Sequence, residues 1–201
     1  MNKQEAENFF KKIYTETGSS IDATHWWEHS HNVAIVAETL GKKLNLDSEK
    51  CYVMGLLHDI GGGLAGKQKI IRHTILGYKI MKENNIDEEI ARIAITHLFI
   101  LQDGSHLKQQ YINFEKNEQE FIENYLKNIE YTDYDKLIQI SDLISGREIT
   151  TIELRLFNVF SRHNIIENVK FVSKIKELKE YFESKIGGSI YKPFKDIIKM
   201  Y

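Results

Sequence analysis

The chain has 201 residues, a single cysteine, a single proline and nearly balanced numbers of acidic and basic residues. One cysteine, Cys51, excludes an internal disulfide framework and fits a reducing cytosol. A formal net charge of -2 provides no overall basic field that would favour nucleic acid or an anionic membrane surface. No apolar run approaches the roughly 20 residues of a membrane span, and the N-terminus has no apolar signal core. We therefore expect a soluble cytoplasmic protein with no nucleic-acid or membrane partner, and its oligomeric state stays open.

The near absence of proline leaves long stretches of 3.6-residue periodicity unbroken. The only proline, Pro193, lies close to the C-terminus. Such stretches favour helix, and no repeat, low-complexity stretch or convincing alternating strand pattern competes with them. Hydrophobic residues make up 42% of the chain, which is enough for a packed core. We expect an all-α fold, a single-domain helix bundle over residues 1–201.

The periodicity divides the chain into a series of helices with short connections. Asp47 and Ser48 can cap the helix expected at 48–60, Asp87 the one at 87–99 and Thr132 the one at 132–146. Residues 100–116 fit a loop or a short helix, and residues 61–68 fit a flexible loop. The helices are expected at 4–16, 26–44, 48–60, 73–84, 87–99, 117–129, 132–146, 150–163 and 169–186, with a short tail helix after residue 190.

Helical phase separates the eight histidines. In "HWWEHSHNVAIVAETL", His29 shares the apolar stripe of Val33 and Val36, so it is expected to face the core. His31 is in phase with Glu38 and is expected to point toward solvent. A lone inward histidine is more often a hydrogen-bonded core residue than a metal ligand, so His29 alone leaves both alternatives open.

Further polar residues fall on inward positions. His73 and His97 lie on apolar stripes, and Asp142 interrupts the apolar run "KLIQISDLIS". The stretch "GLLHDIGGG" places His58 and Asp59 at a helix C-terminus, where exposed carbonyls disfavour an acid. A buried carboxylate is costly unless it is paired or binds a metal. Four inward histidines and two inward acids therefore indicate ligands that converge on a cation, and such mixed ligands suit iron, manganese, zinc, nickel or cobalt more than calcium.

The order H…HD…D in this sequence resembles the signature of the HD-domain superfamily of metal-dependent phosphohydrolases. The stretches "HSHNVAIVAETL", "GLLHDIGG" and "LIQISDLISG" carry the resemblance, which covers about residues 26–146. Residues 150–201 would then be C-terminal helices packed on that core. The resemblance implies an all-helical fold with the site inside the bundle. It assigns His29, His58, Asp59 and Asp142 to a first divalent metal ion.

Two more stretches extend the resemblance. "RHTILGYKIM" and "ITHLF" are similar to the extra histidine motifs of HD subgroups that hold two metals, such as HD-GYP proteins and small bacterial diadenosine tetraphosphate hydrolases. They imply that His73 and His97 complete a second metal site, with Asp59 bridging. The Gly-Tyr-Pro motif of the HD-GYP subgroup is absent, so cyclic dinucleotide cleavage is not implied. The whole layout looks closest to small, stand-alone bacterial HD proteins.

No serine or cysteine nucleophile motif appears, so a metal-activated water is the expected nucleophile. Asp59 and its neighbour His58 are the predicted catalytic residues. A substrate phosphate needs cationic partners. The candidates are Arg72 and Arg147, which adjoin predicted ligands, and Lys67 and Lys69, which follow the three glycines.

These features predict a hydrolase that acts on a nucleotide or another small phosphate ester with one or two divalent transition-metal ions. Two alternatives remain: a diiron oxygenase on the same ligands, and a non-catalytic sensor of metal or nucleotide. Trp27 could stack on a nucleobase or merely cover the bundle. The sequence does not name the substrate or the metal.

Overall fold

A computed structural model describes residues 1–17, 23–65, 70–104, 107, 114–163 and 169–199. These residues form helices joined by short turns, and the described part of the chain contains only two isolated β-bridges and no strand. The expected all-α class is therefore confirmed. In chain order the elements, with η for a 3₁₀ turn, are α1 (Lys3–Thr17), α2 (Ala23–Lys43), α3 (Ser48–Leu57), α4 (Gly62–Ala65), η2 (Ile70–Arg72), α5 (His73–Glu83), α6 (Glu88–Ala91), α7 (Ile93–Thr96), η3 (Ile100–Gln102), α8 (Lys116–Asn128), α9 (Asp133–Leu143), α10 (Ile152–His163), α11 (Val169–Ile186) and η5 (Lys192–Phe194).

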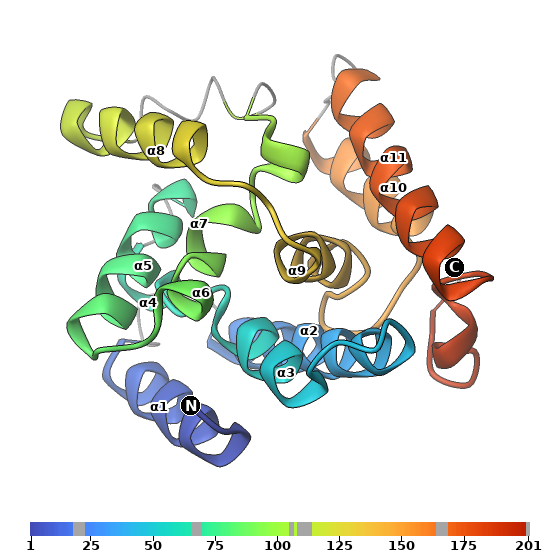
Figure 1. Cartoon of the computed structure of the whole chain (residues 1–201), viewed down its shortest axis with the longest axis horizontal. Helices are drawn as coiled ribbons and strands as arrows, with labels where there is room; N and C mark the ends of the chain where they lie inside the picture. Colours follow the sequence, from blue (N-terminus) through green and yellow to red (C-terminus); the bar gives the residue numbers. More distant parts are fainter. Residues whose placement is uncertain (18–22, 66–69, 105–106, 108–113, 164–168, 200–201) are drawn as a thin grey trace.

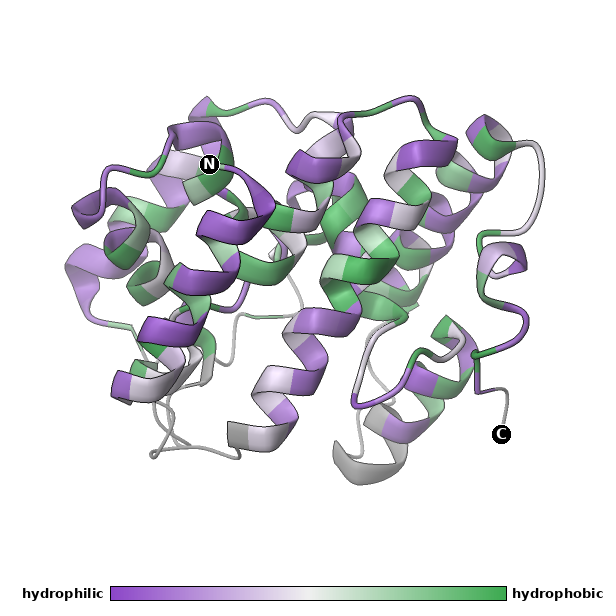
Figure 2. Cartoon of the chain, turned by 90° about the horizontal axis from the view of Figure 1, so that it is seen from below, coloured by the Kyte–Doolittle hydropathy of each residue, from purple (hydrophilic) through white to green (hydrophobic). Residues whose placement is uncertain are grey.

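Helix α9 lies in the middle of the molecule, where Figure 1 shows it end-on with the other helices around it. It contacts α2, α3, α7 and α11. Leu137, Ile138 and Ile140 are fully buried, so α9 is apolar on more than one face, as expected of a helix that is covered all round. In Figure 2 the hydrophobic colour gathers on the inner helices, while the outer helices carry hydrophilic stripes. This arrangement places Asp142, in the last turn of α9, inside the bundle.

Helices α2 and α3 form a close pair that brings two histidines together. Gly55 permits the approach, because a Cβ at this position would lie 2.8 Å from the Cα atom of Ala34. His29 lies in α2 and His58 ends α3. The close packing of these helices is therefore what sets the two imidazoles side by side.

A buried carboxylate ties the start of α9 to α7. Asp135 is fully buried and accepts hydrogen bonds from Arg92, from the Thr96 hydroxyl at 2.9 Å and from the Thr132 amide at 2.8 Å. The last bond belongs to a capping box at Thr132, so the expected cap is confirmed. Since His97 directly follows Thr96, the hydrogen bond from Thr96 to Asp135 also fixes the backbone position of His97.

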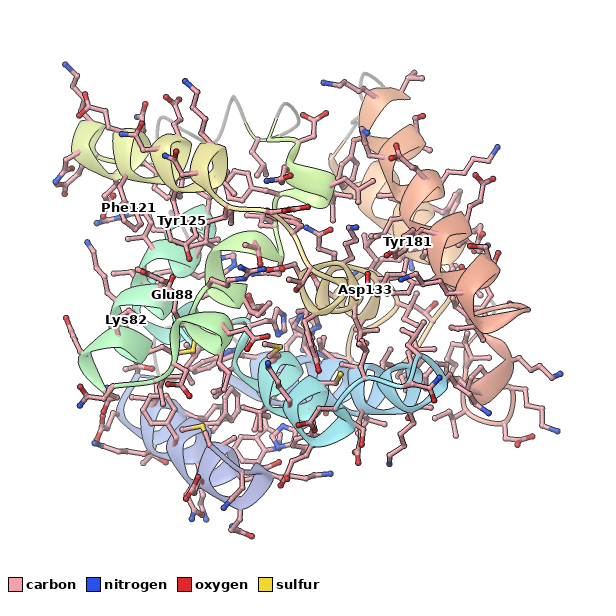
Figure 3. All side chains as sticks on the ribbon, viewed as in Figure 1. Lys82, Glu88, Phe121, Tyr125, Asp133 and Tyr181 are labelled. Carbon is pink, nitrogen blue, oxygen red and sulfur yellow. The ribbon has the colours of Figure 1, made fainter. Side chains whose placement is uncertain are left out.

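Polar contacts hold the outer helices on this frame, and Figure 3 labels several of them. Tyr125 of α8 donates to Glu88 of α6, which also pairs with Lys82 at 2.9 Å. Tyr181 of α11 donates to Asp133 of α9. These contacts join segments that are far apart in the sequence and fix α8 and α11 at opposite sides of the bundle (Figures 1 and 3).

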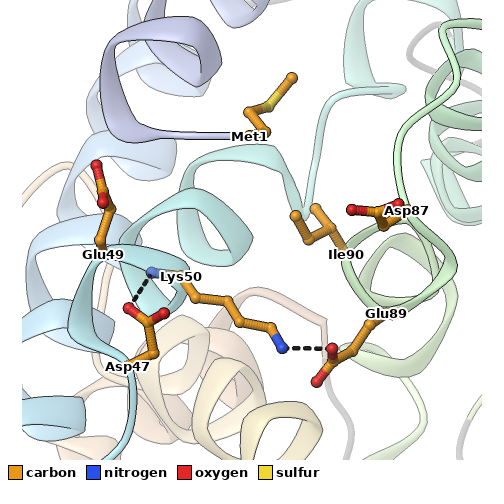
Figure 4. A pocket seen from close by; sticks show the side chains of 7 residues that line it. All are labelled: Met1, Asp47, Glu49, Lys50, Asp87, Glu89 and Ile90. Atoms are coloured by element: carbon orange, nitrogen blue, oxygen red, sulfur yellow. Dashed lines mark hydrogen bonds and ion pairs between the residues drawn. The ribbon is translucent and has the colours of Figure 1, made fainter.

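A shallow polar pocket marks the junction of α3 and α6. In Figure 4 the Lys50 ammonium reaches Glu89 across this junction. Asp47 accepts the Lys50 amide at 3.1 Å, so its expected role as the N-cap of α3 is confirmed. Asp87 precedes α6 as expected, but its side chain makes no capping hydrogen bond. We interpret this pocket as a structural contact, because Lys50 pairs with Glu89, Asp47 caps α3 and Glu49 accepts the Lys3 amide at 2.9 Å.

Two helix expectations need correction. The helix expected at 87–99 is interrupted at Arg92, where the Ile95 amide bonds to the carbonyl three residues back and the Arg92 side chain reaches Asp135. The flexible loop expected at 61–68 contains one helical turn, Gly62–Ala65, and residues 66–69 lie outside the described part. Residues 100–104 begin with the 3₁₀ turn η3, in which Leu101 has a φ of 48°. Among the described residues no helix has both the length and the apolar character that crossing a bilayer requires.

Gly61→Ala is expected to lower the free energy of unfolding by about 3 kcal/mol or more. The new methyl group would overlap backbone atoms, which cannot move aside as a side chain can. A Cβ at Gly61 would overlap the His73 carbonyl oxygen and the Gly77 amide. Gly188→Ala is the matched control, since a Cβ there meets nothing within 4 Å. Urea denaturation checks both variants. Equal stability of the two would show that the approach of residue 61 to α5 is looser than described.

Candidate metal centre

Six side chains from five parts of the chain meet in one cluster, and five of them line a pocket. They are the six ligands expected from the sequence: His29 in α2, His58 and Asp59 at the end of α3, His73 at the start of α5, His97 after α7 and Asp142 in α9. The pocket has a volume of about 400 Å³. Its lining includes five of these ligands together with His25, Trp26, Gly62, Ala65, Leu98 and Arg155.

One ligand group lies between α2, α3 and α9. The Nε2 atom of His29 is 3.2 Å from Asp142 Oδ1 and 3.2 Å from His58 Nε2. Asp59 Oδ2 is 3.5 Å from His29 Nε2 and 3.4 Å from His58 Nε2. Two imidazole nitrogens and two carboxylate oxygens therefore surround one point.

A second ligand group uses the other oxygen of the same aspartate. Asp59 Oδ1 is 3.0 Å from His73 Nε2 and 3.3 Å from His97 Nε2. The two imidazole nitrogens are 3.1 Å apart. Because Oδ2 faces the first group and Oδ1 faces the second, Asp59 is placed as a bridging carboxylate would be.

The tautomers of two histidines favour a cation. His58 Nδ1 lies 2.7 Å from the Gly55 carbonyl oxygen, and His97 Nδ1 lies 2.9 Å from that of Ile93. A carbonyl oxygen only accepts, so each neutral imidazole carries its proton on Nδ1 and turns the lone pair of Nε2 toward Asp59. Lone pairs that face a carboxylate at this range repel it unless a cation lies between them. The residues therefore fit a divalent metal, and the backbone contacts supply the orienting partners that metal-bound histidines normally have.

Burial agrees with the helical phase. The four histidines are at most 8% exposed, so their expected inward orientation is confirmed. The side chains of Asp59 and Asp142 keep 23% and 24% exposure because both open into the pocket. Within the described part of the chain, the ion-pair partners of these two carboxylates are all histidines.

Protons and metal compete for this site. Burial alone would lower the pKa of His29, but hydrogen bonds to Asp142 and Asp59 and the charges of both carboxylates raise it to about 9. The pKa of Asp142 is lowered in turn, since the hydrogen bond and charge of His29 outweigh the effect of burial. A proton on His29 thus replaces part of the missing positive charge when no metal is bound.

The metal-free protein is accordingly expected to lose stability as the pH rises. A pKa raised from 6.5 to about 9 contributes stability that is complete below pH 6.5 and is lost as the pH passes about 9. The loss should be roughly 3 kcal/mol at most. Urea denaturation in a chelator at several pH values measures it. His29→Gln should flatten this pH dependence, and an unchanged slope in that variant would assign the effect to another group.

Of the four basic residues expected at the substrate, the two that the structure describes do not line the pocket. Arg72 pairs with the buried Glu118 at 2.8 Å, and the Arg147 side chain is 59% exposed with Glu28 at 3.9 Å. Neither arginine is among the residues that line the pocket. Each lies beside a carboxylate outside the pocket, Arg72 beside Glu118 and Arg147 beside Glu28. Lys67 and Lys69 lie outside the described residues.

The structure adds pocket residues that the sequence argument missed. Arg155 lines the pocket from α10, and no motif in the sequence marked it. Trp26 is buried, and its indole N–H donates to the Asp59 carbonyl oxygen at 3.0 Å. That bond fixes the backbone of the bridging aspartate. Buried indole groups usually find such a partner.

The expected orientation of His31 is wrong. Its Nδ1 is 2.8 Å from the Trp27 carbonyl oxygen, and its Nε2 is 3.2 Å from Glu7 of α1. The ring also stacks on Trp27 with centroids 4.4 Å apart. Helix α1 therefore covers the polar stripe of α2, and of the two roles left open for Trp27 the structure favours covering the bundle.

Comparison with known proteins shows that a family model matches the chain. The sequence model of the HD domain matches residues 26–147, which is more than half of the chain. No curated protein matches the sequence of this chain. A solved structure, the HD domain of the L. monocytogenes phosphodiesterase PgpH, is similar at 17% identity with a TM-score of 0.47, and the match covers 87% of this chain and 97% of that chain. On the family match, the chain belongs to the HD-domain family of metal-dependent phosphohydrolases.

Proposed function

We propose that this protein hydrolyses a phosphate ester of a small molecule, with a nucleotide as the leading candidate, using one or two divalent transition-metal ions. The observation that carries the proposal is the position of Asp59. Its two oxygens face two separate histidine groups at 3.0–3.5 Å. Pairs of metals held in this way suit in-line displacement at phosphorus.

The proposed ligands divide into two sets that share Asp59. His29, His58 and Asp142 would hold one ion, and His73 and His97 would hold the other. A divalent metal bound there would supply hydroxide at neutral pH and polarise the phosphoryl oxygens. The identity of the metal stays a proposal among iron, manganese, zinc, nickel and cobalt, since all of them accept this donor set.

The chain's own residues supply position and surroundings. Asp59, held through its backbone by Trp26, would orient the attacking water, and the Nε2 atom of His58 would bind the ion that Asp59 Oδ2 faces. Trp26, Ala65 and Leu98 line the same pocket and reduce its water content. A volume of about 400 Å³ suits a small organic phosphate, since small-molecule pockets commonly run from about 300 to 1,000 Å³.

A phosphate-release screen tests the proposal. The full chain is loaded separately with manganese, iron, zinc, nickel and cobalt, and is assayed on nucleoside mono-, di- and triphosphates and on sugar phosphates. We expect phosphate or nucleotide release that depends on metal, stops with a chelator and proceeds equally without oxygen.

The rival functions give different results in the same screen. Substrate loss only in the presence of oxygen, without phosphate release, would identify a diiron oxygenase. Tight binding of a nucleotide without turnover by any metal form would identify a sensor. Either result would overturn the hydrolase proposal.

A further inference from the structure

Arg155 is the single arginine or lysine that lines the pocket in the part of the chain that the structure describes. It lies in α10, one turn after the loop that follows Asp142. The arginines expected beforehand at this place, Arg72 and Arg147, lie near Glu118 and Glu28 instead. The pocket therefore has a cationic group that comes from outside the region of the family match, residues 26–147.

The guanidinium of Arg155 rests on a glycine. A Cβ at Gly146 would lie 3.0 Å from Arg155 Nη1, so any other residue there would press on the guanidinium. Among the described residues no carboxylate forms an ion pair with Arg155, whereas Arg72 and Arg92 each have a buried acid. Since the Arg155 guanidinium lines the pocket and forms no ion pair with a described carboxylate, its N–H groups can donate to a bound anion.

The loop beneath Arg155 is held to the metal-binding helix. The side-chain amide of Asn32 donates to the carbonyl oxygens of Gly146 and Arg147, both at 3.0 Å. Asn32 lies in α2, three residues after His29. The position of the guanidinium is thereby coupled through one helix to the position of a metal ligand.

We propose that Arg155 binds the phosphate group of the substrate, with its guanidinium in the space that the missing side chain of Gly146 leaves. The inference rests on the proposed function, because it needs a phosphate beside the metal centre. A guanidinium has planar, paired donors that match two phosphate oxygens at once. In this pocket it would face an anion whose other oxygens lie toward the six ligands.

Binding of inorganic phosphate tests the proposal without requiring turnover. The manganese-loaded full chain is titrated with phosphate by calorimetry, after its metal content and melting temperature are measured. Arg155→Gln is expected to weaken phosphate binding at least about 10-fold, in line with the loss of one charge-assisted hydrogen bond or more. Arg155→Lys should recover part of the affinity, because it restores the charge but not the paired donors. Lys176→Gln, an equal change of charge on an exposed lysine of α11, is the matched control and should bind as the wild type does.

Gly146→Ala provides a second, independent test of the position of the Arg155 guanidinium. It leaves Arg155 in the chain but moves the guanidinium, so it should weaken phosphate binding several-fold with an unchanged metal content. The nearest other atom to the new methyl group, the Glu148 carbonyl oxygen, is 3.7 Å away, so the fold should tolerate it.

The outcomes separate the two proposals. Wild-type affinity in Arg155→Gln at full metal content would overturn the role of Arg155, and so would the absence of phosphate binding in the wild type. Phosphate binding that depends on Arg155, without release of phosphate from any ester, would keep the inference and reject the hydrolase. Turnover with an unchanged KM in Arg155→Gln would keep the hydrolase and reject the inference.

Discussion

Asp59→Asn is expected to lower phosphate release at least about 100-fold, a loss of roughly 2.7 kcal/mol of transition-state stabilisation. The substitution keeps the shape of the side chain and removes the charge that both histidine groups share. Metal content should fall with turnover, because one oxygen of Asp59 faces His29 and His58 and the other faces His73 and His97. Elemental analysis and phosphate release on the same preparation measure the two effects.

Asp133→Asn is the matched control for this variant. Asp133 is also an aspartate of the central region, but its partners are Tyr181 and Lys185, which join α9 to α11 away from the pocket (Figure 3). The control should keep its metal and its turnover and lose about 1 kcal/mol of stability at most. If Asp59→Asn keeps full metal occupancy and activity, the bridging role is wrong.

The second large effect is expected from His29→Ala. This variant removes a ligand whose Nε2 lies 3.2 Å from Asp142 Oδ1, and its metal affinity should fall at least about 100-fold, beyond the typical 10–100-fold of a supporting residue. Competition with a chromogenic chelator measures the affinity.

His31→Ala should show the reverse pattern. His31 contacts Trp27 and Glu7, so its loss weakens the docking of α1 and should cost about 1–2 kcal/mol of stability. Its metal affinity should match the wild type. A fall in metal affinity equal to that of His29→Ala would contradict this expectation. It would show that the contact between α1 and His31 is needed for metal binding.

The two histidines also show how far sequence reasoning extends. Helical phase located His29, His73 and His97 because a ligand inside a bundle must lie on the stripe that faces the core. Phase failed for His31 because a polar stripe can be covered by another helix. Here α1 covers it, with Glu7 on His31 and Lys3 on Glu38. Such packing joins segments that no local pattern relates.

Long-range contacts explain the other differences. The interruption at Arg92 goes with a bond to Asp135, which lies 43 residues later. Arg155 enters the pocket because the loop after Asp142, held by Asn32, brings α10 back over the site. In the sequence each of these residues is an ordinary helical charge. Local patterns thus predicted the helices and the inward histidines, and the family resemblance supplied the expected ligand set, while the groups around that set depended on tertiary packing.

The most direct test of the account is an anomalous diffraction map from crystals of the manganese-loaded protein. The account predicts a peak among His29, His58, Asp59 and Asp142, and a second peak among Asp59, His73 and His97 when the site is saturated. Paired metals in hydrolases lie about 3.5–4 Å apart, and the two peaks should show that separation with Asp59 between them. A map without a peak within reach of Asp59, from crystals whose metal has bound elsewhere or not at all, would contradict the central claim.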